Sequence, residues 1–192
     1  MIPTVEECFE LMDKYRMLEN IKDHSVMVAR VAGMITRKMQ DAGRNDLSLD
    51  LAVASALLHD IAKTACLDSN ENHAAQGREI CLEHDFFEVA DIVGEHVVLS
   101  NGVPQDCCSE KEIVYYADKR VLHDRIVSIE DRLEYILDRY GQNDARLHHL
   151  IEQNFRICRT IEQRIFDVLE LQPDGLTDMV NGHPLVLEHF NL

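Results

Sequence analysis

The chain has 192 residues, of which 46% are hydrophobic and 28% are charged, and its formal net charge is −16. This length suits one domain with a sizeable core, and the composition is that of an ordinary globular protein. The acidic balance disfavours binding to long nucleic acid or to an anionic membrane surface. No apolar run approaches the roughly 20 residues of a membrane span. The first residues show no signal-peptide pattern, so we expect a cytoplasmic protein.

The cysteines indicate thiols rather than a disulfide framework. None of them forms a C-x-x-C pair, the spacing that zinc ribbons and thioredoxin-like sites require. We expect reduced side chains that mostly fill the core. The six residues are Cys8, Cys66, Cys81, Cys107, Cys108 and Cys158.

Helix signals dominate the first third of the chain. Thr4 and Glu7 form a capping-box pattern, and a second helix is expected from about Lys22 to Gly43. Ser48 can cap a third helix that runs through Lys63. This third segment is apolar on nearly every side, so we expect it at the centre of the fold.

The same punctuation continues to the C-terminal region. The remaining expected helices are Ser69 or Asn70 through Glu83, residues 86–98, Ser109 with Glu112 through residue 122, Ser128 with residues 129–140, and Asn143 through about Leu171. Beyond Gln172 we expect a loop-like tail that folds back over the body. The fold class predicted for residues 1–192 is therefore all-α, a single-domain helical bundle.

The stretch LLHDIAKT, residues 57–64, contains the feature that is hardest to explain by packing alone. It places His59, Asp60 and Lys63 directly after an apolar segment. Burying these groups together is costly unless each finds a partner. The other His-Asp pairs, at residues 84–85 and 123–124, lie at a helix end and in a charged stretch, so we expect them at the surface or behind a site. Solvated positions are expected for His148, His149, His183 and His189.

Further histidines and an aspartate occur at comparable positions in separate apolar helical stretches. A lone histidine in such a place is more often a hydrogen-bonded core residue than a metal ligand. A set of imidazoles and carboxylates on separate helices is, however, a plausible ligand set for a divalent metal inside a bundle. The set is His24, His59, Asp60, His73, His96 and Asp118.

These residues, in this order, resemble the HD superfamily of metal-dependent phosphohydrolases and its HDIG-like subgroup. The resemblance covers about residues 20–125, leaving C-terminal helices and a tail over 126–192, and includes H73-A-A-Q-G77, similar to an H-x-x-x-G element. It implies an HD-type helical domain with a metal site in its core. His24, His59, Asp60 and Asp118 would hold one divalent ion. Members that also keep the two intermediate histidines often hold a second ion, and here His73 and His96 would complete that position, with Asp60 bridging. Whether one or two ions bind per chain is left open, because in a mononuclear site both histidines would lie behind the ligands. Fe, Mn, Ni, Co and Zn all suit these ligands.

The resemblance implies hydrolysis of a small phosphorylated substrate or nucleotide by metal-activated water, since a bound dication lowers the pKa of water from about 15.7 to near 7. Asp60 and Lys63 are then the candidate catalytic residues. The candidate substrate-binding cations are Lys63, Lys119, Arg120 and Arg125. Lys63 could equally pair with a ligand carboxylate, and the other three could be exposed ion-pair partners.

Two other function classes remain open at this point. Some superfamily members use the same scaffold as di-iron oxidative enzymes, and others are non-catalytic signalling modules. The chain lacks the GYP tripeptide of cyclic-dinucleotide phosphodiesterases and has IAKT where guanosine-tetraphosphate hydrolases carry an acidic pair. Residues 96–108 also differ from the loop expected of the small dinucleoside-tetraphosphate hydrolases. Substrate identity and the oligomeric state, including a homo-oligomer, are left open.

Overall fold

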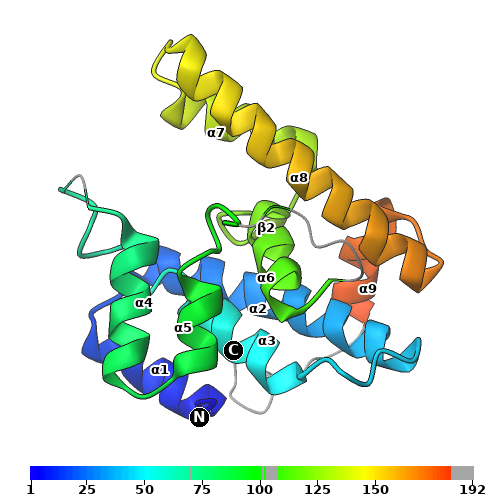
Figure 1. The fold of residues 1–192 in the computed structure, drawn as a ribbon, viewed down its shortest axis with the longest axis horizontal. Helices are drawn as coiled ribbons and strands as arrows, with labels where there is room; N and C mark the ends of the chain where they lie inside the picture. The colour runs from blue at the N-terminus through cyan, green and yellow to red at the C-terminus, as the bar shows by residue number, and fades with distance from the viewer. Residues whose placement is uncertain (70, 101, 103–107, 183–192) are drawn as a thin grey trace.

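The computed structural model describes residues 1–69, 71–100, 102 and 108–182, and over these ranges the fold is almost entirely helical (Figure 1). The all-α prediction is confirmed. The α-helices are α1 (Val5–Lys14), α2 (Glu19–Asp41), α3 (Leu49–Leu58), α4 (His73–Glu83), α5 (Phe87–Val93), α6 (Glu110–Lys119), α7 (Ile129–Tyr140), α8 (Ala145–Leu169) and α9 (Leu176–Gly182). Within these ranges no helix has the length and apolar character needed to cross a bilayer.

Most of the predicted helix starts are confirmed by their capping bonds. Thr4 and Ser109 each form a capping box with the glutamate three residues on, at α1 and α6. The Ser48 side chain accepts from the backbone N–H of Leu51, and Ser128 caps α7 in the same way. Each bond satisfies a backbone donor that the first helical turn leaves free.

Two predicted caps are displaced along the chain. Helix α4 is capped by Asn72, whose side chain accepts from two backbone N–H groups, rather than by Ser69; Asn70 lies outside the described residues. Helix α8 is capped by Asp144, because Asn143 has a positive φ of 55° and belongs to the preceding turn. Neighbouring polar residues offer equivalent capping groups, so the backbone turn decides which of them is used.

Two helices end earlier than predicted, and a histidine is involved at each end. Helix α3 stops at Leu58, and the Nδ1 of His59 donates to the carbonyl of Ala56 at 2.7 Å. Helix α5 stops at Val93, whose carbonyl accepts from the Nδ1 of His96 at 2.7 Å. An imidazole that bonds a terminal carbonyl replaces a backbone donor of the next helical turn.

Helix α6 also ends early, at Lys119, and a short β-hairpin follows it. Its strands, β1 (Val121–Leu122) and β2 (Arg125–Ile126), pair antiparallel with Val121 opposite Ile126. His123 has a positive φ of 56° in the connecting turn. The hairpin was not predicted, and it redirects the chain into α7.

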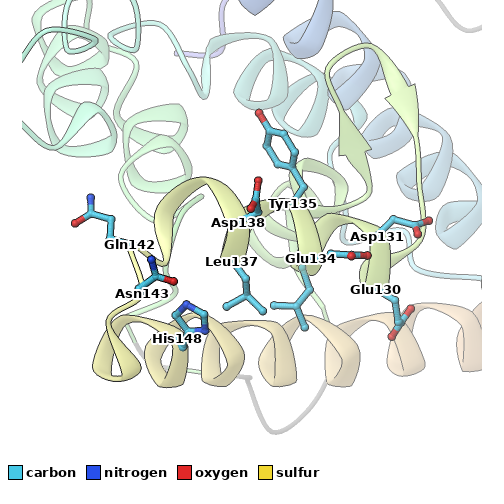
Figure 2. A pocket seen from close by; sticks show the side chains of 10 residues that line it. Glu130, Asp131, Glu134, Tyr135, Leu137, Asp138, Gln142, Asn143 and His148 are labelled. Atoms are coloured by element: carbon cyan, nitrogen blue, oxygen red, sulfur yellow. The ribbon is translucent and has the colours of Figure 1, made fainter.

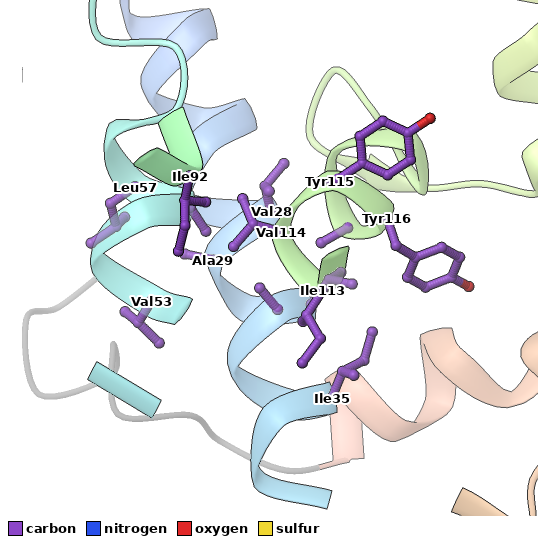
Figure 3. Packing of buried hydrophobic residues seen from close by; sticks show 14 of the residues in the cluster. Val28, Ala29, Ile35, Val53, Leu57, Ile92, Ile113, Val114, Tyr115 and Tyr116 are labelled. Carbon is purple, nitrogen blue, oxygen red and sulfur yellow. The ribbon is translucent and has the colours of Figure 1, made fainter. Parts of the chain in front are cut away.

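The core lies where α2, α3, α5 and α6 meet, as Figure 3 shows. Helix α3 is buried from Ala52 to Leu58, which confirms its predicted central position. Helices α7 and α8 pair into a hairpin that extends beyond this core in Figure 1. Side chains from the four core helices interdigitate in Figure 3, including Val28, Ala29, Val53, Leu57, Ile92, Ile113 and Val114.

The start of the C-terminal tail is helical rather than loop-like. It contains the 3-10 turn η1 (Pro173–Gly175) and α9, which packs against α2 through its buried Leu176 and Val180. The predicted return of the tail over the body is therefore confirmed for residues 173–182, whereas residues 183–192 lie outside the described part. The cysteines of the described residues are mostly buried, as expected of core thiols. The buried thiols are Cys8, Cys81, Cys108 and Cys158; Cys66 is half-buried, and Cys107 is not described.

Candidate metal centre

The six candidate metal ligands meet at one place in the fold. His24 lies near the start of α2, His73 is the first residue of α4, and Asp118 lies near the end of α6. His59 and Asp60 directly follow α3, and His96 follows α5. The ends of five helices thus bring side chains from distant sequence positions together. His59, Asp60 and His96 are almost completely buried.

The first group of side chains surrounds one oxygen of Asp60. Its Oδ2 lies 3.3 Å from the Nε2 of His59 and 4.0 Å from the Nε2 of His24. Asp118 is on the same side, with its Oδ1 3.1 Å from His24 Nε2 and 3.8 Å from His59 Nε2. The ligand atoms of His24, His59 and Asp60 all lie within 4.8 Å of one another, a spacing that a single ion can bridge.

The second group surrounds the other oxygen of the same carboxylate. Asp60 Oδ1 lies 3.3 Å from the Nε2 of His73 and 3.5 Å from the Nε2 of His96. The two Nε2 atoms are 3.2 Å apart, and these three side chains also form a group compact enough for one ion. Asp60 is thus shared, with one oxygen facing each group.

Backbone carbonyls hold three of the four imidazoles in a defined orientation. The Nδ1 of His24 donates to the carbonyl of His123 at 2.9 Å. His59 and His96 make the corresponding bonds to Ala56 and Val93. Because a carbonyl only accepts, each Nδ1 carries a proton, and Nε2 is the ring nitrogen that faces the cluster; in a neutral ring it offers a lone pair there. The exposed His123 thus contributes its backbone to the support of the site.

The protein alone does not satisfy this arrangement of acceptors. Among the described residues, the buried His59 Nε2 and Asp60 Oδ1 have no hydrogen-bond partner. Burial lowers the pKa of His96 to about 4, so its ring is neutral at pH 7. A cation placed between these two unpartnered atoms would satisfy both of them. Imidazole nitrogens with carboxylate oxygens suit divalent Fe, Mn, Co, Ni and Zn, so the residues present fit such an ion.

The charges around the cluster keep both carboxylates ionised. Burial opposes ionisation of Asp60, but His59 and Lys63 hold its pKa well below the usual range. Burial likewise opposes ionisation of Asp118, whereas Lys119 and His24 lower its pKa. Burial disfavours protonation of His59, yet Asp60 and Asp118 raise its pKa. The buried negative charge therefore favours a cation at this position.

The candidate substrate-binding cations occupy very different places. Lys63 Nζ lies 2.6 Å from Asp60 Oδ2, and its side chain is 30% exposed, so it borders both the cluster and solvent. Lys119 is buried and donates to the carbonyl of His96 at 2.9 Å, with Asp118 Oδ2 at 3.5 Å. Lys119 therefore supports two candidate ligands from within the core.

The two arginines predicted beside Lys119 are directed at other partners. Arg120 donates to Tyr116 and to Glu162 on α8, and its Nε donates to the carbonyl of Val127. These bonds hold α8 and the segment that follows the β1–β2 hairpin against α6. Arg125 is 86% exposed on β2, with Asp124 4.0 Å away. Neither arrangement supports the predicted contact with substrate, because α6 ends at Lys119 and the chain then turns away.

Arg132, which the sequence analysis did not single out, also lies beside the cluster. It lies on α7, is buried, and places its Nη2 3.5 Å from Asp118 Oδ1. No local sequence pattern marks Arg132, because its approach to Asp118 depends on the turn that the β1–β2 hairpin makes between α6 and α7.

Gly77 in the H-x-x-x-G element has a packing role: a Cβ there would lie 2.9 Å from Val93 Cγ1.

A pocket of about 840 Å³ lies beside α7 and the start of α8 (Figure 2). In this view the ring of Tyr135 points away from α8, whereas Leu137 points toward it. The lining includes four carboxylates and none of the six candidate ligands. An acidic pocket of this kind is unsuited to a phosphate group. The acidic lining residues are Glu130, Asp131, Glu134 and Asp138.

The other histidines lie apart from the cluster. His84 contacts Lys14 and Tyr15, with its Nε2 3.1 Å from the lysine Nζ. His149 is exposed and His148 lines the pocket described above. The remaining two, at positions 183 and 189, lie outside the described residues. Within the described residues, only one of the three His-Asp pairs, residues 59–60, contributes its side chains to the cluster.

Comparison with known proteins agrees with this geometry. The profile of the family described as HD domain matches residues 21–136, more than half of the chain, and the chain therefore belongs to the HD domain family. Proteins of this family are generally metal-dependent hydrolases and bind divalent metals. The matched segment contains all six candidate ligands and Arg132.

Two curated proteins are similar to part of the chain. Ribonuclease Y of Treponema denticola is 38% identical over 101 residues, 52% of this chain and 18% of that protein. Ribonuclease Y of Treponema pallidum is 31% identical over 135 residues, 64% of this chain and 24% of that protein. The chain thus spans about a quarter or less of the length of these relatives. No solved structure matches significantly.

Proposed function

We propose that this chain is a metal-dependent phosphohydrolase that acts on a small phosphorylated substrate or nucleotide. The observation that carries the proposal is the position of Asp60, whose two oxygens face two separate histidine groups. Bound dications would supply an activated water nucleophile and polarisation of the phosphoryl group. The proposed ligands are His24, His59, Asp60, His73, His96 and Asp118.

In this proposal the residues of the chain have distinct tasks. The carbonyls behind His24, His59 and His96 fix the imidazoles, so each Nε2 is available without rearrangement. Asp60 carries negative charge to both positions. Lys63 balances that charge and, because its side chain is partly exposed, can also donate to a phosphoryl oxygen. Asp60 and Lys63 are therefore the proposed catalytic residues.

Removing the ammonium should slow the reaction without abolishing it. We expect Lys63→Ala to lower kcat/KM by about 10- to 100-fold, because a charge-assisted hydrogen bond contributes about 1.5–3 kcal/mol. The matched control is Lys22→Ala, since Lys22 pairs with Asp13 and Glu19 at the surface. Steady-state kinetics on the metal-loaded variants measure both effects. Equal losses in the two variants would remove Lys63 from the proposed catalytic residues.

RNA is a second candidate substrate, and the names of the two relatives favour it. The net charge of −16 favours a small anion over a long polyanion. The deciding experiment offers phosphomonoesters, nucleotides and an RNA oligonucleotide to the protein loaded with each candidate metal in turn. Release of phosphate or nucleotide from the small substrates supports the proposal. Cleavage of the oligonucleotide alone would replace it with a nuclease activity.

The same screen separates the other function classes. Redox-active iron without any hydrolysis would indicate an oxidative di-iron enzyme. A protein that binds none of the metals would indicate a non-catalytic signalling module. Either result would contradict the phosphohydrolase proposal.

A further inference from the structure

Within the described residues, Arg132 has a buried donor without a hydrogen-bond partner at the edge of the metal centre. Its side chain is 10% exposed, and within the described residues its Nε is buried without a hydrogen-bond partner. Nη2 lies 3.5 Å from Asp118 Oδ1, a distance that allows electrostatic attraction but not a good hydrogen bond. A buried guanidinium with free N–H groups is costly unless another acceptor binds there.

Asp118 does not require Arg132 as its only counter-charge. Lys119 Nζ lies 3.5 Å from the other oxygen, Oδ2, and His24 Nε2 lies 3.1 Å from Oδ1. The surroundings of Asp118 thus already hold a buried cation and a histidine. A pure ion-pair role for Arg132 also leaves its Nε unexplained. The unpartnered Nε and the loosely paired Nη2 point to an anionic ligand that carries more than one acceptor.

The neighbours of Arg132 fix where such a ligand would bind. The guanidinium carbon lies 5.7 Å from the centre of the Tyr135 ring, and that ring contacts His123, whose carbonyl supports His24. Helix α7 is therefore linked to the first group of candidate ligands through both its arginine and its tyrosine. Arg132 does not line the acidic pocket of Figure 2.

We propose that Arg132 binds the phosphoryl group of the substrate at the first group of ligands, through the paired donors of its guanidinium. The planar fork of arginine matches two oxygens of a phosphate, which a lysine ammonium cannot do. The inference rests on the proposed function and adds a residue from α7 to the substrate site. Lys63 and Arg132 would then contact the phosphoryl group from the sides of Asp60 and Asp118, respectively.

The test measures metal and phosphate binding separately by calorimetry. The proteins are the wild type, Arg132→Gln, Arg132→Lys and the control Arg139→Gln, an exposed arginine two turns further along α7. Mn²⁺ is titrated first, and inorganic phosphate is then titrated into the Mn²⁺-saturated protein. We expect Arg132→Gln to weaken phosphate binding by about 10- to 100-fold and Arg132→Lys to weaken it less. Mn²⁺ affinity should change by less than about threefold, and Arg139→Gln should resemble the wild type.

Several outcomes would overturn the inference. The first is an unchanged phosphate affinity in Arg132→Gln, and the second is the absence of phosphate binding to the Mn²⁺-saturated wild type. The third is a loss of Mn²⁺ affinity in Arg132→Gln that equals the loss of phosphate affinity. That result would make Arg132 a positioning residue for Asp118. If circular dichroism shows that Arg132→Gln is unfolded, the Arg132→Lys result decides. If the wild type hydrolyses substrates while all variants bind phosphate normally, the inference about Arg132 is wrong and the proposed function stands. A wild type that binds no metal would instead contradict the proposed function.

Discussion

Asp60→Asn should abolish metal-dependent hydrolysis, with a loss of at least about a thousandfold in kcat/KM. The substitution keeps the shape of the side chain but removes the negative charge that both histidine groups share. It also replaces one acceptor oxygen with an NH₂ group, which repels a cation and cannot ligate it. A loss of this size is reasonable because a single change would disturb both metal positions.

The sequence supplies a matched control for this variant. Asp124 belongs to another His-Asp pair, and its side chain is 65% exposed. Asp124→Asn should therefore retain wild-type turnover in the same assay. If Asp60→Asn also retained it, the cluster would not be the catalytic site. If both variants lost activity together, the position of Asp60 would not be the cause.

The second large effect concerns stability. Leu57→Ala should lower the free energy of unfolding by about 2–5 kcal/mol, because it opens a cavity in the close-packed core. Leu57 is 0% exposed on α3, among side chains from neighbouring helices (Figure 3). Urea denaturation in the presence of a chelator measures the change without a contribution from metal binding.

Leu67→Ala provides the comparison, because Leu67 is 57% exposed on the segment that follows the site. Its free energy of unfolding should stay within about 0.5 kcal/mol of the wild type. Similar values for the two variants would contradict the central position of α3. The comparison matters for the site, since α3 is the helix that positions His59 and Asp60.

Much of this architecture can be predicted from local chemistry. Capping residues such as Thr4, Ser48 and Ser128 mark helix starts because their side chains bond the adjacent backbone N–H groups. The apolar character of α3 predicts its burial. The six polar residues in apolar stretches are a plausible ligand set, and the resemblance to the HD superfamily implies that they meet at one metal site.

The remaining features depend on contacts between distant segments. The end of α3 is influenced by the hydrogen bond from the His59 side chain to the carbonyl of Ala56, which no capping pattern in the sequence indicates. The hairpin after α6 turns α7 so that Arg132 reaches Asp118, while Arg120 bonds Glu162 on α8. Sequence proximity to Asp118 alone therefore does not indicate which arginine lies beside its carboxylate. The three-dimensional path of the chain decides which cation faces the site.

The number of ions bound per chain tests the central claim most directly. The wild type and His96→Gln are saturated with Mn²⁺, freed of excess metal by dialysis, and analysed for metal by mass spectrometry. We predict two ions per chain for the wild type and one for His96→Gln, because His96 belongs only to the group on Asp60 Oδ1. One ion in both proteins would contradict the second position. A wild type without bound metal would contradict the metal centre itself.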